Sequence, residues 1–183
     1  ITGDIVGQYK PHEFALGGSY ARMLSDQFSL AISGRYIYSN LTGGQYAGGI
    51  ETVAGQSIAS DLAGFYTRPV RLGNKYMDLS IGLNISNIGS KVSYTETSIR
   101  DFIPINMRLG TALDADIDAY NKISLAIDIN KLLVPTPPMT DNGEIILGKD
   151  PDVSVVSGIF QSFGDAPGEL DTDGVYVPGS SFR

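Results

Sequence analysis

Residues 76–87 read YMDLSIGLNISN, and this stretch decides which fold the chain can adopt. Every second residue from Met77 to Ile85 is apolar, and the residues between them are small or polar. Successive side chains of a β-strand point to opposite faces, so this alternation predicts a strand with one apolar and one polar face. The stretch is also about as long as the ~9–11 residues of a tilted strand that crosses a membrane.

The same alternation recurs on both sides of this stretch. We predict six strands, at about 12–24, 28–39, 57–68, 76–87, 103–116 and 122–133. One face of the resulting sheet is expected to meet lipid, through Leu79, Ile81, Leu83, Ile85, Leu109, Leu125 and Ile127. The other face is expected to turn inward, with Asp78, Asn84, Arg108 and Asp128. The fold class expected is therefore all-β, a transmembrane antiparallel β-barrel.

The connections between the predicted strands also alternate in length. Turns near residues 26, 73 and 119 are short, whereas the connections near residues 48 and 95 and from 134 onward are long. Outer-membrane barrels sort their connections in this way, with short periplasmic turns and longer extracellular loops. A soluble β-sandwich, the alternative that a chain with 22 glycines also allows, has no reason to do so.

The composition favours a membrane barrel over that sandwich. Charged residues make up 18% of the chain, below the roughly 25% of an average globular protein. No apolar run approaches the ~18 residues of a transmembrane helix, so a helical membrane protein is excluded. Isolated charges lie on the non-apolar faces of the predicted strands, namely Arg35, Asp61, Asp78, Arg108, Asp114 and Asp128. We expect at least one of the two arginines to pair with a carboxylate of this set, because an unpaired charge inside a barrel is costly.

Six strands cannot close a transmembrane barrel, because the smallest bacterial barrels have about eight. An open sheet edge within lipid would leave backbone groups unpaired, at several kcal/mol for each group. We therefore expect residues 1–183 to be part of a single outer-membrane β-barrel domain. The remaining strands are expected to belong to a longer mature protein.

The sequence offers little for catalysis or metal binding. It contains no cysteine and a single histidine, His12, so neither a thiolate site nor a histidine pair is available. The stretch Asp171-Thr172-Asp173-Gly174 resembles part of a calcium loop, but the ligand spacing and the closing glutamate are absent. A net charge of −7 leaves no basic surface for nucleic acid. We expect no enzymatic activity, no cofactor, no metal and no nucleic-acid partner.

The chain from residue 134 onward is predicted to be a long extracellular loop. Adjacent prolines at 137 and 138 end the sixth strand, because proline cannot donate a hydrogen bond to a sheet. Loops of such length are usually functional or disordered, and the apolar residues in this one argue against disorder. The loop either packs on the rim of the barrel as a lid or binds a partner. For partner binding, the candidate residues are Phe160, Phe163, Asp165 and Pro167.

Four motifs of the chain resemble one known family. They are GLNISNIG at 82–89, FIPINMRLG at 102–110, DINKLLVPTP at 128–137 and QSFGDAPG at 161–168. Taken together, they resemble the PorV family, also called LptO, of outer-membrane barrel proteins from the type IX secretion system. That family is similar in fold to the FadL fatty-acid channels.

The resemblance implies a FadL-like barrel of about fourteen strands, an even number as in other bacterial barrels. It implies a non-enzymatic protein of the bacterial outer membrane, in contact with outer-membrane lipids and with extracellular long loops. Such a protein binds the C-terminal signal domain of exported cargo at an SprA-type translocon barrel and shuttles the cargo to a PorU-type attachment complex at the cell surface. The alternatives are a FadL-like transporter of small hydrophobic molecules and a purely structural barrel.

Overall fold

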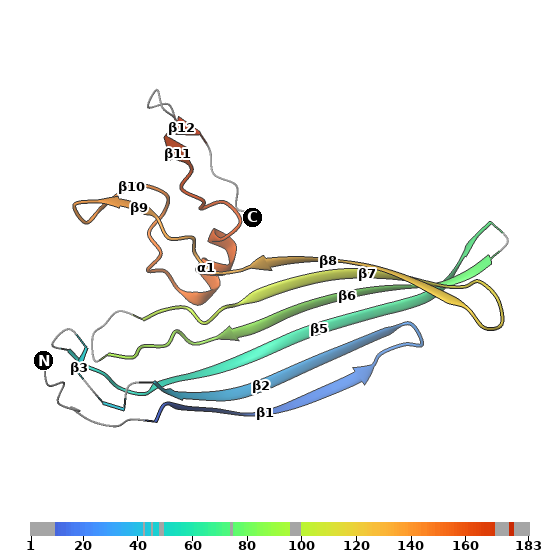
Figure 1. Ribbon diagram of the computed structural model, residues 1–183, viewed down its shortest axis with the longest axis horizontal. Helices are drawn as coiled ribbons and strands as arrows, with labels where there is room; N and C mark the ends of the chain where they lie inside the picture. The colour runs from blue at the N-terminus through green and yellow to red at the C-terminus, as the bar shows by residue number, and fades with distance from the viewer. Residues whose placement is uncertain are drawn as a thin grey trace, which may run out of the picture.

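The computed structural model describes residues 10–41, 43–44, 46–47, 50–73, 75–95, 100–170 and 176–177. Six long strands form one antiparallel sheet (Figure 1). They are β1 (His12–Met23), β2 (Phe28–Asn40), β5 (Gly55–Leu72), β6 (Lys75–Gly89), β7 (Asn106–Asp116) and β8 (Lys122–Leu132). Three short hairpins and one helix complete the described structure. They are β3 (Tyr46–Ala47) with β4 (Ile50–Glu51), β9 (Met139–Asp141) with β10 (Glu144–Leu147), β11 (Glu169–Leu170) with β12 (Tyr176–Val177), and α1 (Val155–Gln161).

The six long strands form a simple meander. Each pairs with the next long strand along the chain, so the order across the sheet is β1-β2-β5-β6-β7-β8. The strands β1 and β8 are the two edges, and among the described residues the sheet does not close on itself. The prediction of an all-β antiparallel fold that is a six-strand portion of a barrel is thus confirmed.

Two strand ends differ from the predicted ranges by more than two residues, and proline is involved in both. The strand β7 begins at Asn106 because Pro104 interrupts the chain before it, and the Ile105 N–H donates to the Ile103 carbonyl at 2.7 Å in a tight turn. The strand β5 continues past Pro69. Its last pair with β2 is at Tyr66, so Pro69 lies where β5 has a partner on one side only, and edge positions tolerate a missing N–H.

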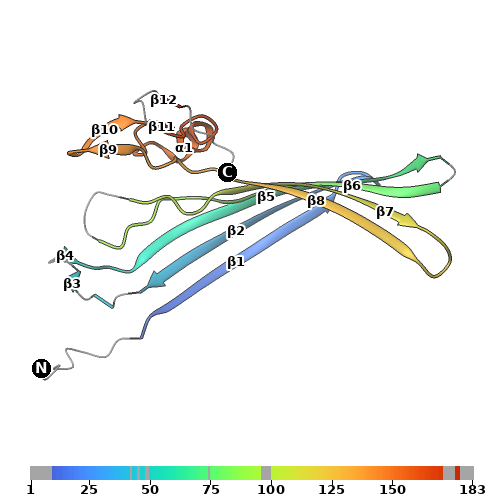
Figure 2. The same cartoon turned by 45° about the horizontal axis from the view of Figure 1, so that its top comes forward.

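The connections are sorted between the two ends of the sheet. The turns at 24–27, at Gly73 and at 117–121 lie at one end, which we call the short-turn end. The opposite, long-loop end holds the described parts of the connections between β2 and β5 and between β6 and β7, together with the segment after β8 (Figures 1 and 2). The predicted sorting of the connections is therefore present in the structure.

The turn between β7 and β8 is organised by Asp118. Its carboxylate accepts hydrogen bonds from the Asn121 side chain and from the N–H groups of Tyr120 and Asn121, at 2.8 to 2.9 Å. The Asn121 side chain contributes most to lowering the pKa of Asp118 below its usual value, followed by the Tyr120 N–H. The stabilisation that this carboxylate gives the turn is present above the unfolded pKa of about 3.9 and is lost as pH falls through the lower folded value.

We expect the replacement Asn121→Ala to raise the pKa of Asp118 back toward its ordinary value. The reason is that Asn121 donates to both carboxylate oxygens through its side chain. An NMR titration of the labelled aspartate carboxyl carbons in the intact barrel measures the shift. An unchanged titration of Asp118 in the variant would contradict the role given to Asn121.

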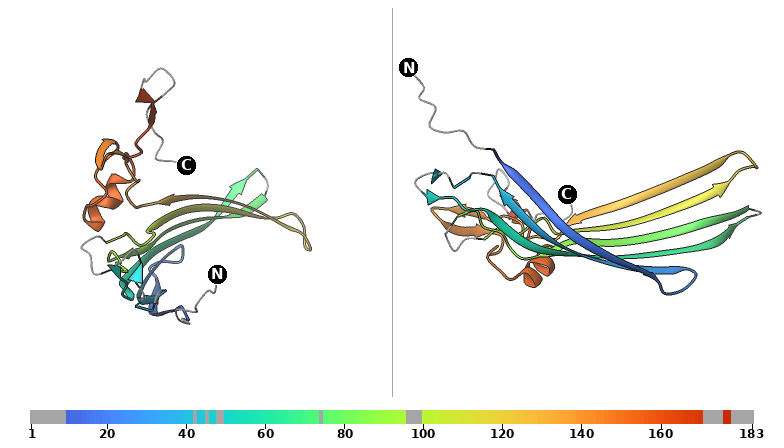
Figure 3. Two further views of the ribbon diagram at one scale, coloured as in Figure 1. Left: turned by 60° about the vertical axis from the view of Figure 1, so that its left-hand side comes forward. Right: turned by 90° about the horizontal axis from the view of Figure 1, so that it is seen from below.

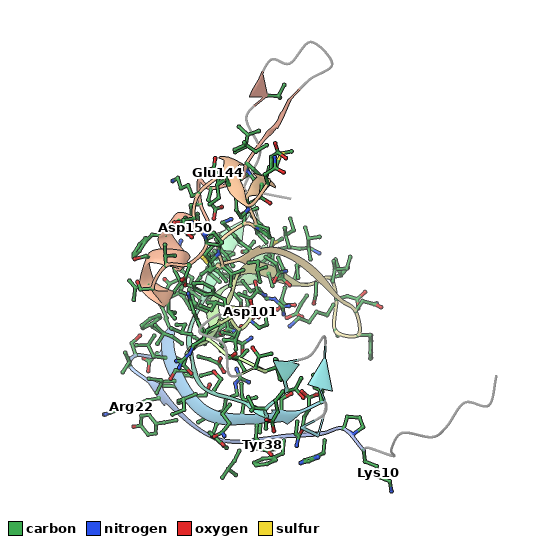
Figure 4. All side chains as sticks on the ribbon, turned by 90° about the vertical axis from the view of Figure 1, so that its left-hand side faces the viewer. Lys10, Arg22, Tyr38, Asp101, Glu144 and Asp150 are labelled. Atoms are coloured by element: carbon green, nitrogen blue, oxygen red, sulfur yellow. The ribbon has the colours of Figure 1, made fainter. Side chains whose placement is uncertain are left out.

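The two faces of the sheet differ in chemistry. The sheet is curved (Figure 3), and in the view along its strands the labelled Arg22 and Tyr38 lie on its convex side (Figure 4). The strand register places Tyr38 on the same face as Ile32, Leu62 and Ile85. The same face carries every position predicted to meet lipid, namely Leu79, Ile81, Leu83, Ile85, Leu109, Leu125 and Ile127. The convex face is therefore the apolar face, and the concave face carries the small and polar residues, including Asp78, Asn84, Arg108 and Asp128.

Candidate functional site

The convex face has the chemistry of a surface that contacts lipid. Large apolar residues along it are exposed, and Ile127 in the middle of β8 has 60% of its surface accessible. Near the long-loop end, stacked aromatic rings follow β1 and β2, as in the pair Phe14 and Tyr38, whose centroids are 5.2 Å apart. Phe28 and Tyr66 form a second aromatic pair near the short-turn end.

The spacing of these aromatic groups matches a membrane. Phe28 and Tyr38 are ten residues apart on β2, which is about 33 Å at roughly 3.3 Å per residue. A strand tilted by about 40° carries that length across roughly 25 Å, the usual height of the apolar band between the two aromatic girdles of an outer-membrane barrel. The sheet thus has the dimensions of a membrane-spanning wall.

A polar cluster lies on the concave face, toward the long-loop end. Arg35 on β2 and Asp61 on β5 form an ion pair, with Nη2 and Oδ1 2.5 Å apart. Asp61 also accepts from the Ser33 hydroxyl at 2.7 Å, and Arg35 donates to the Asn87 side-chain oxygen at 2.9 Å. The predicted pairing of an inner arginine with an inner carboxylate is confirmed by Arg35 and Asp61.

The polar cluster is built around a β-bulge. Ser86 and Asn87 of β6 lie opposite the single residue Asp61 of β5, where the register shifts between the two strands. Asn87 has a positive φ of 61°, which asparagine tolerates better than most residues. Its N–H, which the bulge removes from the ladder, donates to Asp61 at 2.8 Å, and its side chain donates to the Pro104 carbonyl at 2.8 Å. Asp61 therefore connects β2, β5 and β6, and Asn87 links this cluster to Pro104 in the turn before β7.

The other predicted inner charges lie away from this cluster. Arg108 donates through Nε to the Asn130 side-chain oxygen at 2.9 Å, so its described partner is an amide. Asp128, two residues before Asn130 on β8, lies opposite Gly110, and a side chain at position 110 would collide with the Asp128 carboxylate. Asp78 lies near the short-turn end, opposite Asp114. The structure therefore brings together Arg35 and Asp61, and it separates them from Asp78, Arg108 and Asp128.

Residues 133–168, which we call the C-terminal segment, fold back against the long-loop end of the sheet (Figure 2). Lys131 of β8 anchors this segment. The register places Lys131 on the convex face, opposite Met107, yet it is only 6% exposed. Its Nζ donates to the Ser162 carbonyl at 2.9 Å and lies 5.0 Å from the centre of the Phe163 ring. Lys131 thus holds the turn that directly follows α1 against the sheet.

A second lysine holds the other end of α1. Lys91 Nζ forms an ion pair with Asp152 at 2.9 Å and lies 4.5 Å from the centre of the Phe102 ring. The same ring packs against Gly158 of α1, where an added Cβ would come within 2.7 Å of two ring carbons. Lys91 and Lys131, each paired with a phenylalanine, therefore clamp α1 from both sides.

Asp165 closes the C-terminal segment onto itself. It is 2% exposed, and its carboxylate accepts from the N–H and the hydroxyl of Thr136, each at 2.7 Å. Ser154 begins α1 as an N-cap whose side chain accepts from the Ser157 N–H. The segment predicted as a long loop is thus a small folded unit.

The four residues predicted to bind a partner differ in accessibility. Phe160 on α1 is 73% exposed and Phe163 is 43% exposed, whereas Asp165 is buried and Pro167 is half-buried. Neither Lys91 nor Lys131 was predicted from the sequence to have a role. A signal for Lys131 was present, because it is the one charged residue in the alternating apolar positions of β8, after Ile127 and Ile129.

We expect Gly158→Ala to loosen α1 from the wall. The added methyl group would overlap the Phe102 ring, and such overpacking typically costs about 1–3 kcal/mol. Faster hydrogen exchange in residues 150–165 of the intact barrel measures the loosening. Gly164→Ala is the matched control, since a Cβ at Gly164 meets nothing within 4 Å. Equal exchange in the two variants would contradict the packing role assigned to Phe102.

Within the described part of the chain, no group of three or more His, Cys, Asp or Glu side chains could hold a metal ion. The calcium-like stretch at 171–174 lies outside the described residues. None of the described helices is long and apolar enough to span a membrane.

The antiparallel meander, the apolar convex face and the two aromatic girdles define a portion of a transmembrane β-barrel. The family model described as type IX secretion system protein PorV matches residues 4–139. This chain belongs to that family. No curated protein matches the chain at a significant level. The family match covers the sheet and ends at Met139, so α1 and the four predicted partner-binding residues lie beyond it.

Proposed function

We propose that this protein is a non-enzymatic, cargo-binding shuttle of type IX secretion in the bacterial outer membrane. It binds the C-terminal signal domain of exported proteins at an SprA-type translocon barrel and passes them to a PorU-type attachment complex. Residues 1–183 form part of a single barrel domain of about fourteen strands, as the family resemblance implies, with an even strand number. The long-loop end faces the outside of the cell.

The observation that carries this proposal is the clamped helix α1 with its exposed aromatic side chain. The convex face is committed to lipid and the concave face to the barrel interior, so a protein partner has access chiefly to the long-loop end. There, Phe160 and Val156 are more than 60% exposed on one side of a helix that two lysines hold in place. Rigidly held aromatic side chains are the usual hot spots of protein interfaces.

The four candidate residues take different roles in this proposal. Phe160 and Phe163 contact the cargo directly. Asp165 acts as a positioning residue, because its buried carboxylate holds Thr136 and thereby the fold of the segment. Pro167 stiffens the chain that follows, since its ring restricts the backbone.

We expect the double replacement Phe160→Ala and Phe163→Ala to weaken binding of a purified cargo signal domain by about 2 kcal/mol or more. That loss corresponds to roughly a 30-fold higher Kd. Surface plasmon resonance with the intact barrel in nanodiscs measures it. Because Phe163 also packs on Lys131, Phe160→Ala alone separates binding from segment docking.

Tyr120→Ala is the matched control, since Tyr120 is an aromatic residue even more exposed than Phe160 and lies in a turn at the opposite end of the sheet. Its Kd should stay within twofold of the unmodified protein. If the aromatic double variant assembles and binds cargo normally, α1 acts as a lid on the barrel rim and the binding role is wrong.

One observation favours the alternative of a transporter for small hydrophobic molecules. The concave face contains a hollow of about 350 Å³, lined by Phe65 and by small residues such as Gly82 and Ala126. Mass spectrometry of lipids retained by the purified intact barrel tests this alternative. If the purified barrel retains lipid in a stoichiometric amount and the Ala126→Phe variant does not, the transporter alternative is supported. If that variant still binds cargo, the shuttle function stands.

A further inference from the structure

A groove of about 500 Å³ lies beside the clamped helix, between the β6–β7 connection and the C-terminal segment. Its walls are apolar, and they are formed by Phe102, Val134, Pro135, Pro137, Pro138 and Pro151. Two of these residues, Phe102 and Pro135, also contact α1 at Gly158. The groove therefore lies against the buried side of α1, at Gly158.

The proline lining determines what the groove can bind. Four of its six apolar residues lack an N–H, so these walls cannot pair with a partner's backbone through amide donors. Proline rings and aromatic rings pack well against each other, as in the domains that bind proline-rich peptides through aromatic grooves. In this groove the prolines are on the receptor, which favours an aromatic side chain on the ligand. The restricted proline backbone also lowers the entropy lost on binding.

The charges around the groove favour a basic neighbour for that aromatic residue. Two of the three charged lining residues are acidic, Asp101 and Asp152, and the third is Arg100. The Asp152 side chain is 89% exposed although it pairs with Lys91, so its carboxylate remains accessible. The three charged lining residues together carry a net charge of −1. Such complementarity contributes mainly to specificity and to the association rate.

We propose that this groove binds an extended segment of the cargo signal domain in which lysine or arginine flanks an aromatic side chain. The aromatic ring inserts between the prolines and Phe102, and the flanking cation pairs with Asp101 or Asp152. This inference rests on the proposed function for the identity of the partner. The preference for an aromatic residue flanked by cations is inferred from the residues that line the groove.

Short synthetic peptides test the groove without any cargo protein. The acetylated and amidated peptides GKFKG, GEFEG and GKAKG are titrated against the intact barrel in nanodiscs, with a ¹⁹F label on the phenylalanine ring or on the acetyl group. The lysine-flanked aromatic peptide should bind at least tenfold more tightly than either of the others, and added salt should weaken its binding. Equal binding of all three peptides, or no binding, overturns the proposal.

Charge reversal locates the binding. Asp101→Lys changes an exposed side chain, because the hydrogen bonds described for Asp101 are those of its backbone with Val92. It should raise the Kd for GKFKG about tenfold. Glu144→Lys, the same charge change on the β9–β10 hairpin outside the groove lining, should change it less than twofold. Equal effects of the two variants would show that the peptide responds to the overall negative charge of this surface, and the proposed binding in the groove would be wrong.

The cargo domain is then measured with the same variants. If it binds the unmodified barrel and Asp101→Lys with equal Kd, the groove proposal is wrong and the shuttle function stands. If the cargo domain does not bind the unmodified barrel, the shuttle function fails. In that case, the peptide series alone tests whether the groove binds an aromatic residue flanked by cations.

Discussion

Replacing Asp61 by alanine is expected to lower the free energy of unfolding of the intact barrel by about 1–3 kcal/mol. Asp61 accepts from the Arg35 guanidinium, the Ser33 hydroxyl and the Asn87 N–H. Without it, a guanidinium on the inner face loses its counter-ion and a bulged N–H loses its acceptor. The pair is half-buried, with 35% of the Arg35 side chain and 22% of the Asp61 side chain exposed, and leaving one charge behind costs more than removing both.

Urea titration of the intact protein in vesicles measures this loss, and Asp78→Ala is the matched control. Asp78 lies on the same concave face, and among the described residues it makes no hydrogen bond through its carboxylate, so its loss should cost less than about 1 kcal/mol. The double replacement Arg35→Met with Asp61→Leu should recover part of the stability. Recovery is incomplete because the Asn87 N–H still has no acceptor. Equal effects of the Asp61 and Asp78 replacements would contradict the role given to the cluster.

The second large effect is expected on the convex face. Leu62→Arg places a charge near the middle of the apolar band, because its partner Ile32 lies about midway between Phe28 and Tyr38 on β2, and outer-membrane barrels lose about 2–4 kcal/mol at such a position. Leu62 is 48% exposed in the sheet, and its partners on the two adjacent strands, Ile32 and Ile85, are apolar and cannot solvate an arginine. The same urea titration measures the cost.

The control for this prediction is the same replacement at a position closer to the membrane surface. Ile123→Arg makes the same kind of change on the same face, close to the short-turn end of β8, where the guanidinium can reach the interface. Its cost should be at most about 1 kcal/mol. Similar costs at both positions would show that the band between the aromatic girdles does not lie in lipid.

The strand pattern could be predicted well because it is local information. A period of two between Met77 and Ile85 is enough to assign a strand and its two faces, and the bulge at Asn87 lies just beyond that run. The family motifs at 82–89 and 102–110 turn out to include residues of the polar cluster and of the turn before β7, such as Asn87 and Pro104. The same motifs identified the family that the sequence comparison shows.

Register decided which charges meet. Six isolated charges on inner positions were candidates for pairing, but only the alignment of β2 against β5 brings Arg35 to Asp61. Arg35 lies diagonally across from Asp61, whose direct partner is Ser33, so a two-residue shift that moves Arg35 further from Asp61 would keep every side chain on its face and break this pair. Alternation specifies the face of a residue and leaves its position along the neighbouring strand open.

The sequence by itself determined the six strands, the face of each residue along them and the sorting of short and long connections, because each depends on neighbours a few residues apart. Only the tertiary structure decided that the chain after β8 is a folded segment that packs against the sheet. Lys131 and Ser162 are 31 residues apart, and Lys91 and Asp152 are 61 apart. Contacts over such separations depend on how the chain returns to the sheet, which no local period encodes.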